Sequence, residues 1–280
     1  MRMVHPILES VKPVIENSSH VKTNLVKIME LAERLKDYEF PQQDYKFYPD
    51  LDKEELCQFA FILNSINFQF REFHAPWKKF EVEYQGQVYS GFFGLAYSLR
   101  KAVEEGIPIL DSNYLANLSK EQALKFLKGR NMIIPMFDER VKILNEIGTV
   151  LSERYEGKFS NFIRVSNKAF DNGKGLVERL AEEFHAFNDV RLYKPTNTLV
   201  KFYKKAQLLF ASLHCNPNSG FKLADIDQLT VFADYKLPQA LRDLRILEHS
   251  RDLAYKIDNR ILIPEGSDEE IEIRAHIIYA

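Results

Sequence analysis

One carboxylate in this sequence stands out for the chemistry it could perform. Asp234 closes the apolar run Leu229-Thr230-Val231-Phe232-Ala233 and precedes Pro238, a residue suited to the first turn of a helix. An unpaired buried carboxylate is costly, so such a residue usually has a partner or a task. Two interpretations fit: a helix cap or ion-paired structural residue, or an anion that stabilises a cationic transition state and positions or deprotonates a water.

A lysine in the segment Phe202-Tyr203-Lys204-Lys205-Ala206-Gln207 is the second such residue. On a helical wheel, one face of this segment is apolar (Phe202, Ala206, Leu209, Phe210 and Leu213). Lys204 falls opposite, beside further apolar residues, so the helix is predicted to be buried nearly all round. Its ammonium either pairs with Asp234 or reaches water while its stem packs. Lys205, on the flank of the core face, is the better candidate for reaching water, so we predict a buried pair of Lys204 and Asp234.

Helical periodicity dominates the rest of the chain. Asp52 with Glu55 and Ser119 with Gln122 have capping-box spacing at two predicted helix starts. Alternating residues around Gln85-Gly86 predict a β-hairpin over residues 80–89. The sequence therefore predicts an all-α fold, mainly helical with a minor β-hairpin, as one domain over residues 1–280. The predicted helices cover residues 25–35, 56–70, 92–103, 123–127, 141–155, 176–184, 199–215, 239–247 and 250–257.

Composition excludes several classes of function. The 280 residues carry a formal charge of -2, which favours a small ligand over stable binding to nucleic acid. Neither the two cysteines nor the seven histidines have metal-ligand spacing, and no phosphate-loop, dinucleotide or nucleophile-elbow motif occurs, so we expect no metal and no cofactor. No segment has the character of a signal peptide or a membrane span, so we expect a cytoplasmic protein. The oligomeric state is left open.

Several blocks of the sequence carry a resemblance to a known family. They are Ile66-Asn67-Phe68-Gln69-Phe70, Tyr89-Ser90-Gly91-Phe92-Phe93, Glu105-Gly106-Ile107-Pro108-Ile109, Glu139-Arg140, Asn145-Glu146, the Lys204 segment, Phe232-Ala233-Asp234-Tyr235-Lys236-Leu237-Pro238-Gln239, and Glu272-Ile273-Arg274. In this order, they resemble the queuosine salvage protein family, the queuosine 5′-phosphate N-glycosylases. The similarity runs from about residue 15 to the end of the chain.

The resemblance implies a fold similar to that of the helix-hairpin-helix DNA glycosylases. It implies an N-glycosidase that hydrolyses queuosine 5′-monophosphate and releases queuine, a 7-deazaguanine base, for salvage into tRNA modification. Two alternatives remain open: a glycosylase that acts on another modified nucleotide or on nucleic acid, and a non-catalytic helical module that binds a nucleobase or a partner.

The same resemblance implies which residues form the site. The matched Asp234 lies at the active site and contacts the base, and Phe232 lies beside the base. Lys204 either keeps Asp234 ionised or binds the 5′-phosphate as a point charge. Phe68, Phe92 and Tyr235 lie in matched blocks and are candidates for stacking on the flat base, although most phenylalanines pack in cores. Asn67 either reads an edge of the base or caps a helix.

Overall fold

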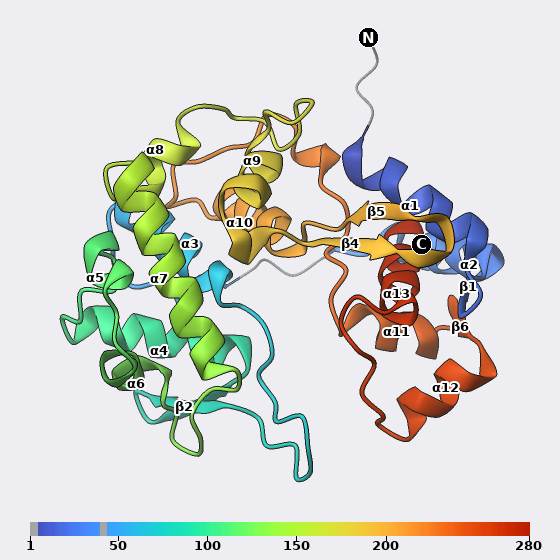
Figure 1. Ribbon diagram of the computed structural model, residues 1–280, viewed down its shortest axis with the longest axis horizontal. Helices are drawn as coiled ribbons and strands as arrows, with labels where there is room; N and C mark the ends of the chain where they lie inside the picture. The colour runs from blue at the N-terminus through green and yellow to red at the C-terminus, as the bar shows by residue number, and fades with distance from the viewer. Residues whose placement is uncertain (1–4, 40–43) are drawn as a thin grey trace.

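The computed structural model describes residues 5–39 and 44–280, and over these residues the chain is mainly helical, as predicted (Figure 1). The described α-helices are α1 (Pro6–Asn17), α2 (Leu25–Leu35), α3 (Lys53–Ser65), α4 (Phe92–Glu104), α5 (Ser112–Ala116), α6 (Lys120–Leu127), α7 (Phe137–Arg154), α8 (Phe159–Ile163), α9 (Leu176–Glu183), α10 (Lys204–Cys215), α11 (Leu237–Asp243), α12 (Arg251–Asp258) and α13 (Asp268–Tyr279). Short 3₁₀ turns lie at His185–Phe187, Lys194–Thr196 and Ile226–Gln228.

The strands form small antiparallel pairs between the helices. They are β1 (Val21–Thr23), β2 (Glu81–Tyr84), β3 (Gln87–Ser90), β4 (Val190–Tyr193), β5 (Thr198–Lys201) and β6 (Leu247–His249), and they pair β1 with β6, β2 with β3 and β4 with β5. The predicted hairpin over residues 80–89 is confirmed as β2–β3, in which Glu81 lies opposite Ser90. Gln85 and Gly86 form its turn with φ of 48° and 76°. Glycine suits such a backbone because it has no Cβ.

The larger of two lobes comprises residues 44–187 and 204–228 and is built around an aromatic core. Phe61 of α3 is fully buried, and its ring stacks on Phe159 with centroids 4.2 Å apart. Phe184 meets the same ring edge-on at 5.1 Å. Helix α10 packs against α3 and α9, so this core holds the helix that carries Lys204 in place.

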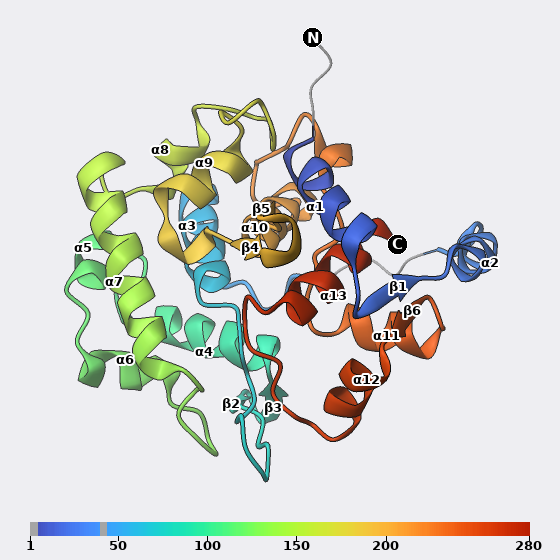
Figure 2. The same ribbon diagram turned by 45° about the vertical axis from the view of Figure 1, so that its right-hand side comes forward.

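The smaller lobe joins both ends of the chain and is built mainly from residues 5–39, 190–201 and 233–280, although Ile7 at the start of α1 packs into the core of the larger lobe. One of its apolar clusters lies between α1, the β4–β5 hairpin and α13, and the other lies between β1, β6, α11, α12 and α13. Figure 2 shows α1 and β1 lying against α13 and β6, although they come from opposite ends of the sequence. The lobe therefore depends on contacts that are distant in sequence.

A buried carboxylate ties this smaller lobe together. Glu272 of α13 is 0% exposed and accepts hydrogen bonds from the backbone N–H groups of His20 at 2.6 Å and Val21 at 3.1 Å. The hydroxyl of Tyr193 in β4 donates to it at 3.0 Å. Because the backbone donors lie at the start of β1 and the hydroxyl donor lies in β4, the Glu272 carboxylate links β1, β4 and α13.

The predicted helix over residues 199–215 is wrong at its start. Residues 198–201 form strand β5, and α10 begins only at Lys204. Tyr203 breaks the helix with a φ of 49°. The reason lies in packing: Phe202 is buried in the smaller lobe, whereas Leu209 is buried in the larger one. Apolar residues that share one helical spacing in the sequence are therefore buried in two separate cores.

Other predicted boundaries shift in a similar way. The helix predicted over residues 56–70 ends at Ser65, and the one predicted over residues 239–247 covers Leu237–Asp243 and is followed by β6. Both predicted capping boxes are confirmed, with the Asp52 carboxylate accepting from the backbone N–H of Glu55 at 2.9 Å. The local capping signals therefore located helix starts better than periodicity located helix ends.

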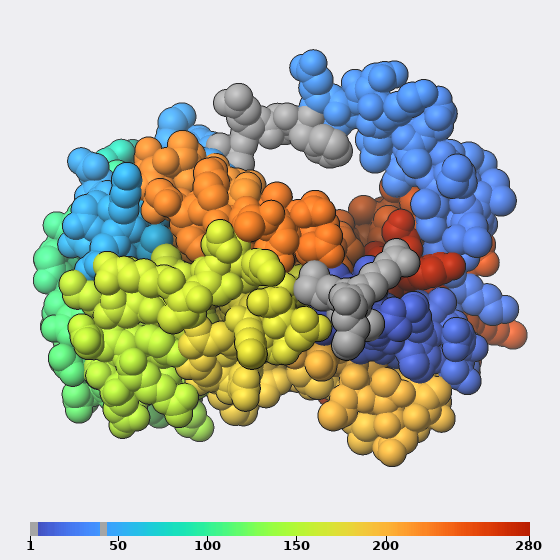
Figure 3. Space-filling model, turned by 90° about the horizontal axis from the view of Figure 1, so that it is seen from above, coloured from blue at the N-terminus to red at the C-terminus, as the bar shows by residue number. Residues whose placement is uncertain are grey.

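The amphipathic helix predicted over residues 25–35 is confirmed as α2. It has no buried residue, and Met29 is 71% exposed. Seen from above, α2 stands away from the body of the molecule (Figure 3). It does not contribute to the site described below.

Candidate active site

Asp234 lies where the chain returns from the larger lobe to the smaller one. Its Oδ1 atom accepts hydrogen bonds from the backbone N–H groups of Lys236 at 2.7 Å and Leu237 at 3.1 Å. The carboxylate is half-buried, not fully buried as predicted. It therefore caps the start of α11, which is the structural interpretation offered above. Both bonds use Oδ1, and within residues 5–39 and 44–280 the Oδ2 atom has no hydrogen-bond partner.

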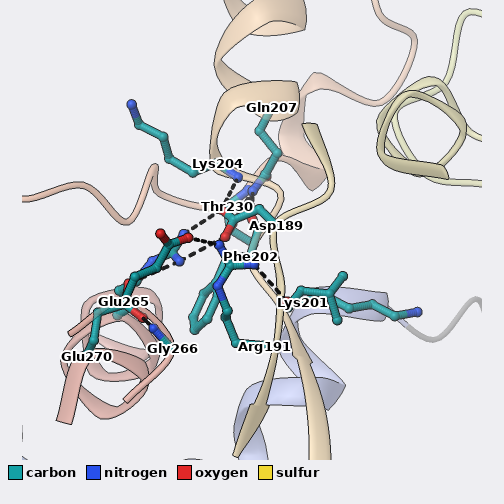
Figure 4. Close-up of polar contacts among 12 residues, drawn as sticks. Asp189, Arg191, Lys201, Phe202, Lys204, Gln207, Thr230, Glu265, Gly266 and Glu270 are labelled. Carbon is teal, nitrogen blue, oxygen red and sulfur yellow. Dashed lines mark hydrogen bonds and ion pairs between the residues drawn. The ribbon is translucent and has the colours of Figure 1, made fainter. Parts of the chain in front are cut away.

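Lys204 is the first residue of α10. Its backbone N–H donates to the Asp189 carboxylate at 3.1 Å, which fixes the start of the helix. Its side chain extends away from Asp189 (Figure 4). Burial lowers the pKa of the Lys204 ammonium, and the negative charges of Asp234 and Asp189 oppose this shift.

The predicted pair of Lys204 and Asp234 does not form as a direct contact. Among the described residues, no carboxylate oxygen lies within 4.0 Å of the Lys204 ammonium. The two charges interact only at longer range. This arrangement leaves both side chains able to contact a third molecule, which a closed ion pair would hinder.

Lys205 is half-buried, and its ammonium contacts the protein, whereas the sequence predicted that it would reach water. Its ammonium donates to the backbone carbonyl of Ser65 at 2.9 Å. It also lies 5.1 Å from the ring centre of Phe68 and 5.5 Å from that of Phe187. Burial lowers the pKa of Lys205 to about 8. Both lysines are half-buried, but Lys205 bonds to the protein, whereas the ammonium of Lys204 has no carboxylate within 4.0 Å among the described residues.

We expect Lys205 to make stability rise with pH. The unfolded chain binds a proton at this site up to about pH 10.4, whereas the folded chain releases it near pH 8. The cost of burying the charged Lys205 ammonium is therefore fully present below the folded pKa. Between the folded and unfolded pKa values the free energy of unfolding rises with pH, by at most about 1.4 kcal/mol per pH unit. Urea unfolding of Lys205→Met across this window should give a flatter pH profile than the unchanged protein. Lys125→Met, on the exposed face of α6, should leave the profile unchanged, and an identical profile for Lys205→Met would contradict this assignment.

An ion pair that the sequence did not predict lies beside the start of α10, where Asp189 accepts from the Lys204 backbone N–H. Arg274 of α13 binds Asp189 in a bidentate manner, with N–O distances of 2.5 Å and 2.9 Å. Their side chains are only 14% and 16% exposed, and the guanidinium lies 3.9 Å from the ring centre of Phe202. Burial opposes both charges, but their mutual attraction outweighs it, so the pKa of Asp189 falls and that of Arg274 rises. Arg274 belongs to a sequence block that carried the resemblance, whereas no sequence signal marked Asp189.

A second missed residue, Arg140, shapes the segment that contains Asn67 and Phe68. Its guanidinium is 0% exposed and donates to the backbone carbonyls of Ile66, Phe68 and Gln69. These bonds satisfy backbone carbonyls just beyond the end of α3 and so fix the backbone of residues 66–69. The same guanidinium lies 4.2 Å from the ring centre of Phe68.

The predicted base-binding residues divide into two groups. Asn67 is 7% exposed, and within the described parts of the chain its side-chain amide makes no hydrogen bond. Phe68 is half-buried between Arg140 and Lys205. Phe92, at the start of α4, makes its ring contacts with Phe47 and Phe93, each at 5.4 Å. The structure therefore places Phe68 beside the lysines of α10, whereas Phe92 belongs to a separate aromatic group.

The other aromatic candidates adjoin Asp234 directly. Phe232 is half-buried, and Tyr235 is 57% exposed, with the ammonium of Lys236 5.8 Å from its ring centre. Burial and the charge of Asp234 raise the pKa of Tyr235, and Arg71 of the larger lobe opposes them. Tyr235 therefore lies where the two lobes face each other.

Of two cavities in the described part of the molecule, one borders the candidate site. One, of about 570 Å³, is lined by Thr230, Val231 and Leu237 and so borders the Asp234 segment. The other, of about 750 Å³, lies at the far end of α10, beside Asn216. The lining of neither includes Asp234 or Lys204.

Residues 5–39 and 44–280 contain no group of three or more His, Cys, Asp or Glu side chains that could hold a metal ion. No described helix has the length and apolar character needed to cross a membrane.

Comparison with known proteins defines the family. Residues 47–280 match the queuosine salvage protein family, and the chain belongs to this family. The resemblance stated from the sequence blocks is therefore confirmed. The chain is 34% identical over 278 residues to the queuosine 5′-phosphate N-glycosylase/hydrolase of Sphaerobacter thermophilus, covering 98% of this chain and 83% of the relative.

Animal proteins with the same description are also similar. The protein from Nematostella vectensis is 32% identical over 243 residues, covering 85% of this chain and 68% of the relative. The protein from Bos taurus is 30% identical over 279 residues, covering 95% of this chain and 80% of the relative. The similarity to each of these three relatives therefore extends over most of the chain.

Proposed function

We propose that this protein hydrolyses the N-glycosidic bond of queuosine 5′-monophosphate with water, giving queuine and ribose 5-phosphate. The observation that carries the proposal is family membership over residues 47–280 together with relatives described as queuosine 5′-phosphate N-glycosylase/hydrolase. The queuine released would serve tRNA modification. We further propose that the fold is of the helix-hairpin-helix DNA glycosylase type and that residues 1–280 act as one domain.

Asp234 is the proposed catalytic group. Cleavage of the bond between base and ribose develops positive charge at C1′, and a fixed anion stabilises that charge more than it stabilises the neutral substrate. The backbone bonds to Oδ1 orient the carboxylate and leave Oδ2 to face C1′ or the attacking water. Lys204, which no carboxylate of the described residues contacts directly, supplies a second charge.

The proposed binding residues enclose a flat base from both sides of the junction. Phe232 and Tyr235 flank Asp234 on one side, and Phe68 and Asn67 lie beside α10 on the other. Phe92 remains a proposed contact, although its ring packs on Phe47 and Phe93.

We also propose a cytoplasmic location. Both cysteines are free, with Cys57 buried, which favours a reducing cytoplasm.

Incubation with three compounds tests the function. We expect free queuine, detected by mass spectrometry, from queuosine 5′-monophosphate and none from guanosine 5′-monophosphate. Queuosine without phosphate shows whether the phosphate is required. Release of guanine alone would favour a glycosylase of other specificity, and binding without any release would favour a non-catalytic module.

A further inference from the structure

A buried amide side chain lies about one helical turn after Lys204. Gln207 of α10 is 0% exposed, and its amide nitrogen and oxygen both make hydrogen bonds within the protein (Figure 4). Its Nε2 atom donates to the backbone carbonyl of Phe202 and to the hydroxyl of Thr230, each at 3.0 Å. Its Oε1 atom accepts from the backbone N–H of Thr230 at 2.8 Å. A buried amide that is bonded at both ends is fixed in one orientation.

The two partners of Gln207 lie where the chain passes between the lobes. Phe202 is buried in the core of the smaller lobe, just before the chain enters α10. Thr230 lies between Leu229, which packs on the core of the larger lobe, and Ala233, which is buried in the smaller lobe. Gln207 therefore links two crossings of the chain to each other and to α10.

The second of these crossings, residues 230–234, leads directly to Asp234. Within residues 5–39 and 44–280 this stretch makes no backbone–backbone hydrogen bond. Backbone with few hydrogen bonds moves at a low cost in free energy, so the remaining ties decide where it lies. The bonds of Gln207 to Thr230 hold this stretch to α10 at the point where it leaves the larger lobe.

We propose that Gln207 is a positioning residue that holds the segment carrying Asp234 against the helix carrying Lys204, and so sets the separation of the two charges that act on the substrate. This inference rests on the function proposed above. Asp234 is oriented by the start of α11 in the smaller lobe, and Lys204 by the start of α10 in the larger one. Their separation therefore depends on how the two lobes are tied together. A displacement of about 1 Å at a catalytic group can slow a reaction roughly 10²-fold.

A double-variant cycle on the rate tests this role. Gln207→Met keeps the length of the side chain and removes its hydrogen bonds. The single-turnover rate of queuine release at saturating queuosine 5′-monophosphate should fall roughly 10–100-fold. In the Asp234→Asn background the same change should alter the rate by no more than about twofold, because the group that Gln207 positions has already lost its charge. The melting temperature of each preparation shows that the comparison is made on folded protein.

Gln58→Met is the matched control. Gln58 of α3 is also buried, and its amide donates to the carbonyl of Leu110 at 3.2 Å and accepts from the backbone N–H of Phe159 at 2.8 Å, both within the larger lobe. Its loss should lower the melting temperature but leave the rate per folded molecule unchanged. Thr230→Val removes only the hydroxyl contact, so it serves if Gln207→Met does not fold, and it should slow release several-fold.

Hydrogen exchange at the backbone amide of Thr230, followed by NMR, gives a second readout that does not rely on turnover. This amide should exchange faster in Gln207→Met and at the normal rate in Gln58→Met. Unchanged exchange in Gln207→Met, an equal loss of rate in both Asp234 backgrounds, or an equal loss in Gln58→Met would overturn the positioning role. If the unchanged protein releases no queuine, the proposed function fails, and the exchange result still decides whether Gln207 holds the segment.

Discussion

Replacing Asp234 by Asn should slow base release by roughly 10²–10⁴-fold, the range for a lost electrostatic or acid–base group. Asn keeps an oxygen that accepts from the backbone N–H groups of Lys236 and Leu237, so the cap of α11 survives. It removes the anion that would face C1′. The measurement is the single-turnover rate of queuine release from queuosine 5′-monophosphate, with the melting temperature recorded on the same preparation.

Two further variants separate charge from structure at this position. Asp243→Asn makes the same chemical change at the exposed end of α11 and should retain full activity. Asp234→Ala removes the cap as well as the charge and should additionally lower the free energy of unfolding by about 1 kcal/mol. If Asp234→Asn melts early yet turns over normally per folded molecule, Asp234 is a structural cap and the catalytic role is lost.

The second large effect concerns the buried pair of Asp189 and Arg274. Asp189→Asn or Arg274→Met alone should lower the free energy of unfolding by about 3–5 kcal/mol, because each leaves an uncompensated buried charge. The double variant should lose less than the sum of the single changes. Urea unfolding of the four proteins gives the coupling energy directly.

Glu270→Gln provides the control for this cycle. Glu270 also contacts Arg274, at 3.3 Å, but it is more exposed and comes one helical turn before it. Its loss should change stability by less than about 1 kcal/mol. Strictly additive effects of Asp189→Asn and Arg274→Met would show that the bidentate contact does not couple these two residues energetically.

Local patterns were sufficient for most of the helices and for the one hairpin that has a clear turn, but they did not predict α1, α5, α8 or α13. The Asp52 capping box and the Gln85-Gly86 turn act through neighbours within a few residues, so sequence spacing reports them directly. The β4–β5 hairpin escaped prediction because its strand at Thr198–Lys201 shares an apolar period with α10. Periodicity shows that a face is apolar, but it cannot show which core buries that face.

The sequence by itself determined the family, the helical class and the two segments that carry Lys204 and Asp234. Only the tertiary structure decided the environment of each group. It placed Lys205 against Phe68 and brought Arg274 to Asp189. These relations join residues far apart in sequence, and their desolvation and charge depend on how the lobes pack, which no local pattern encodes.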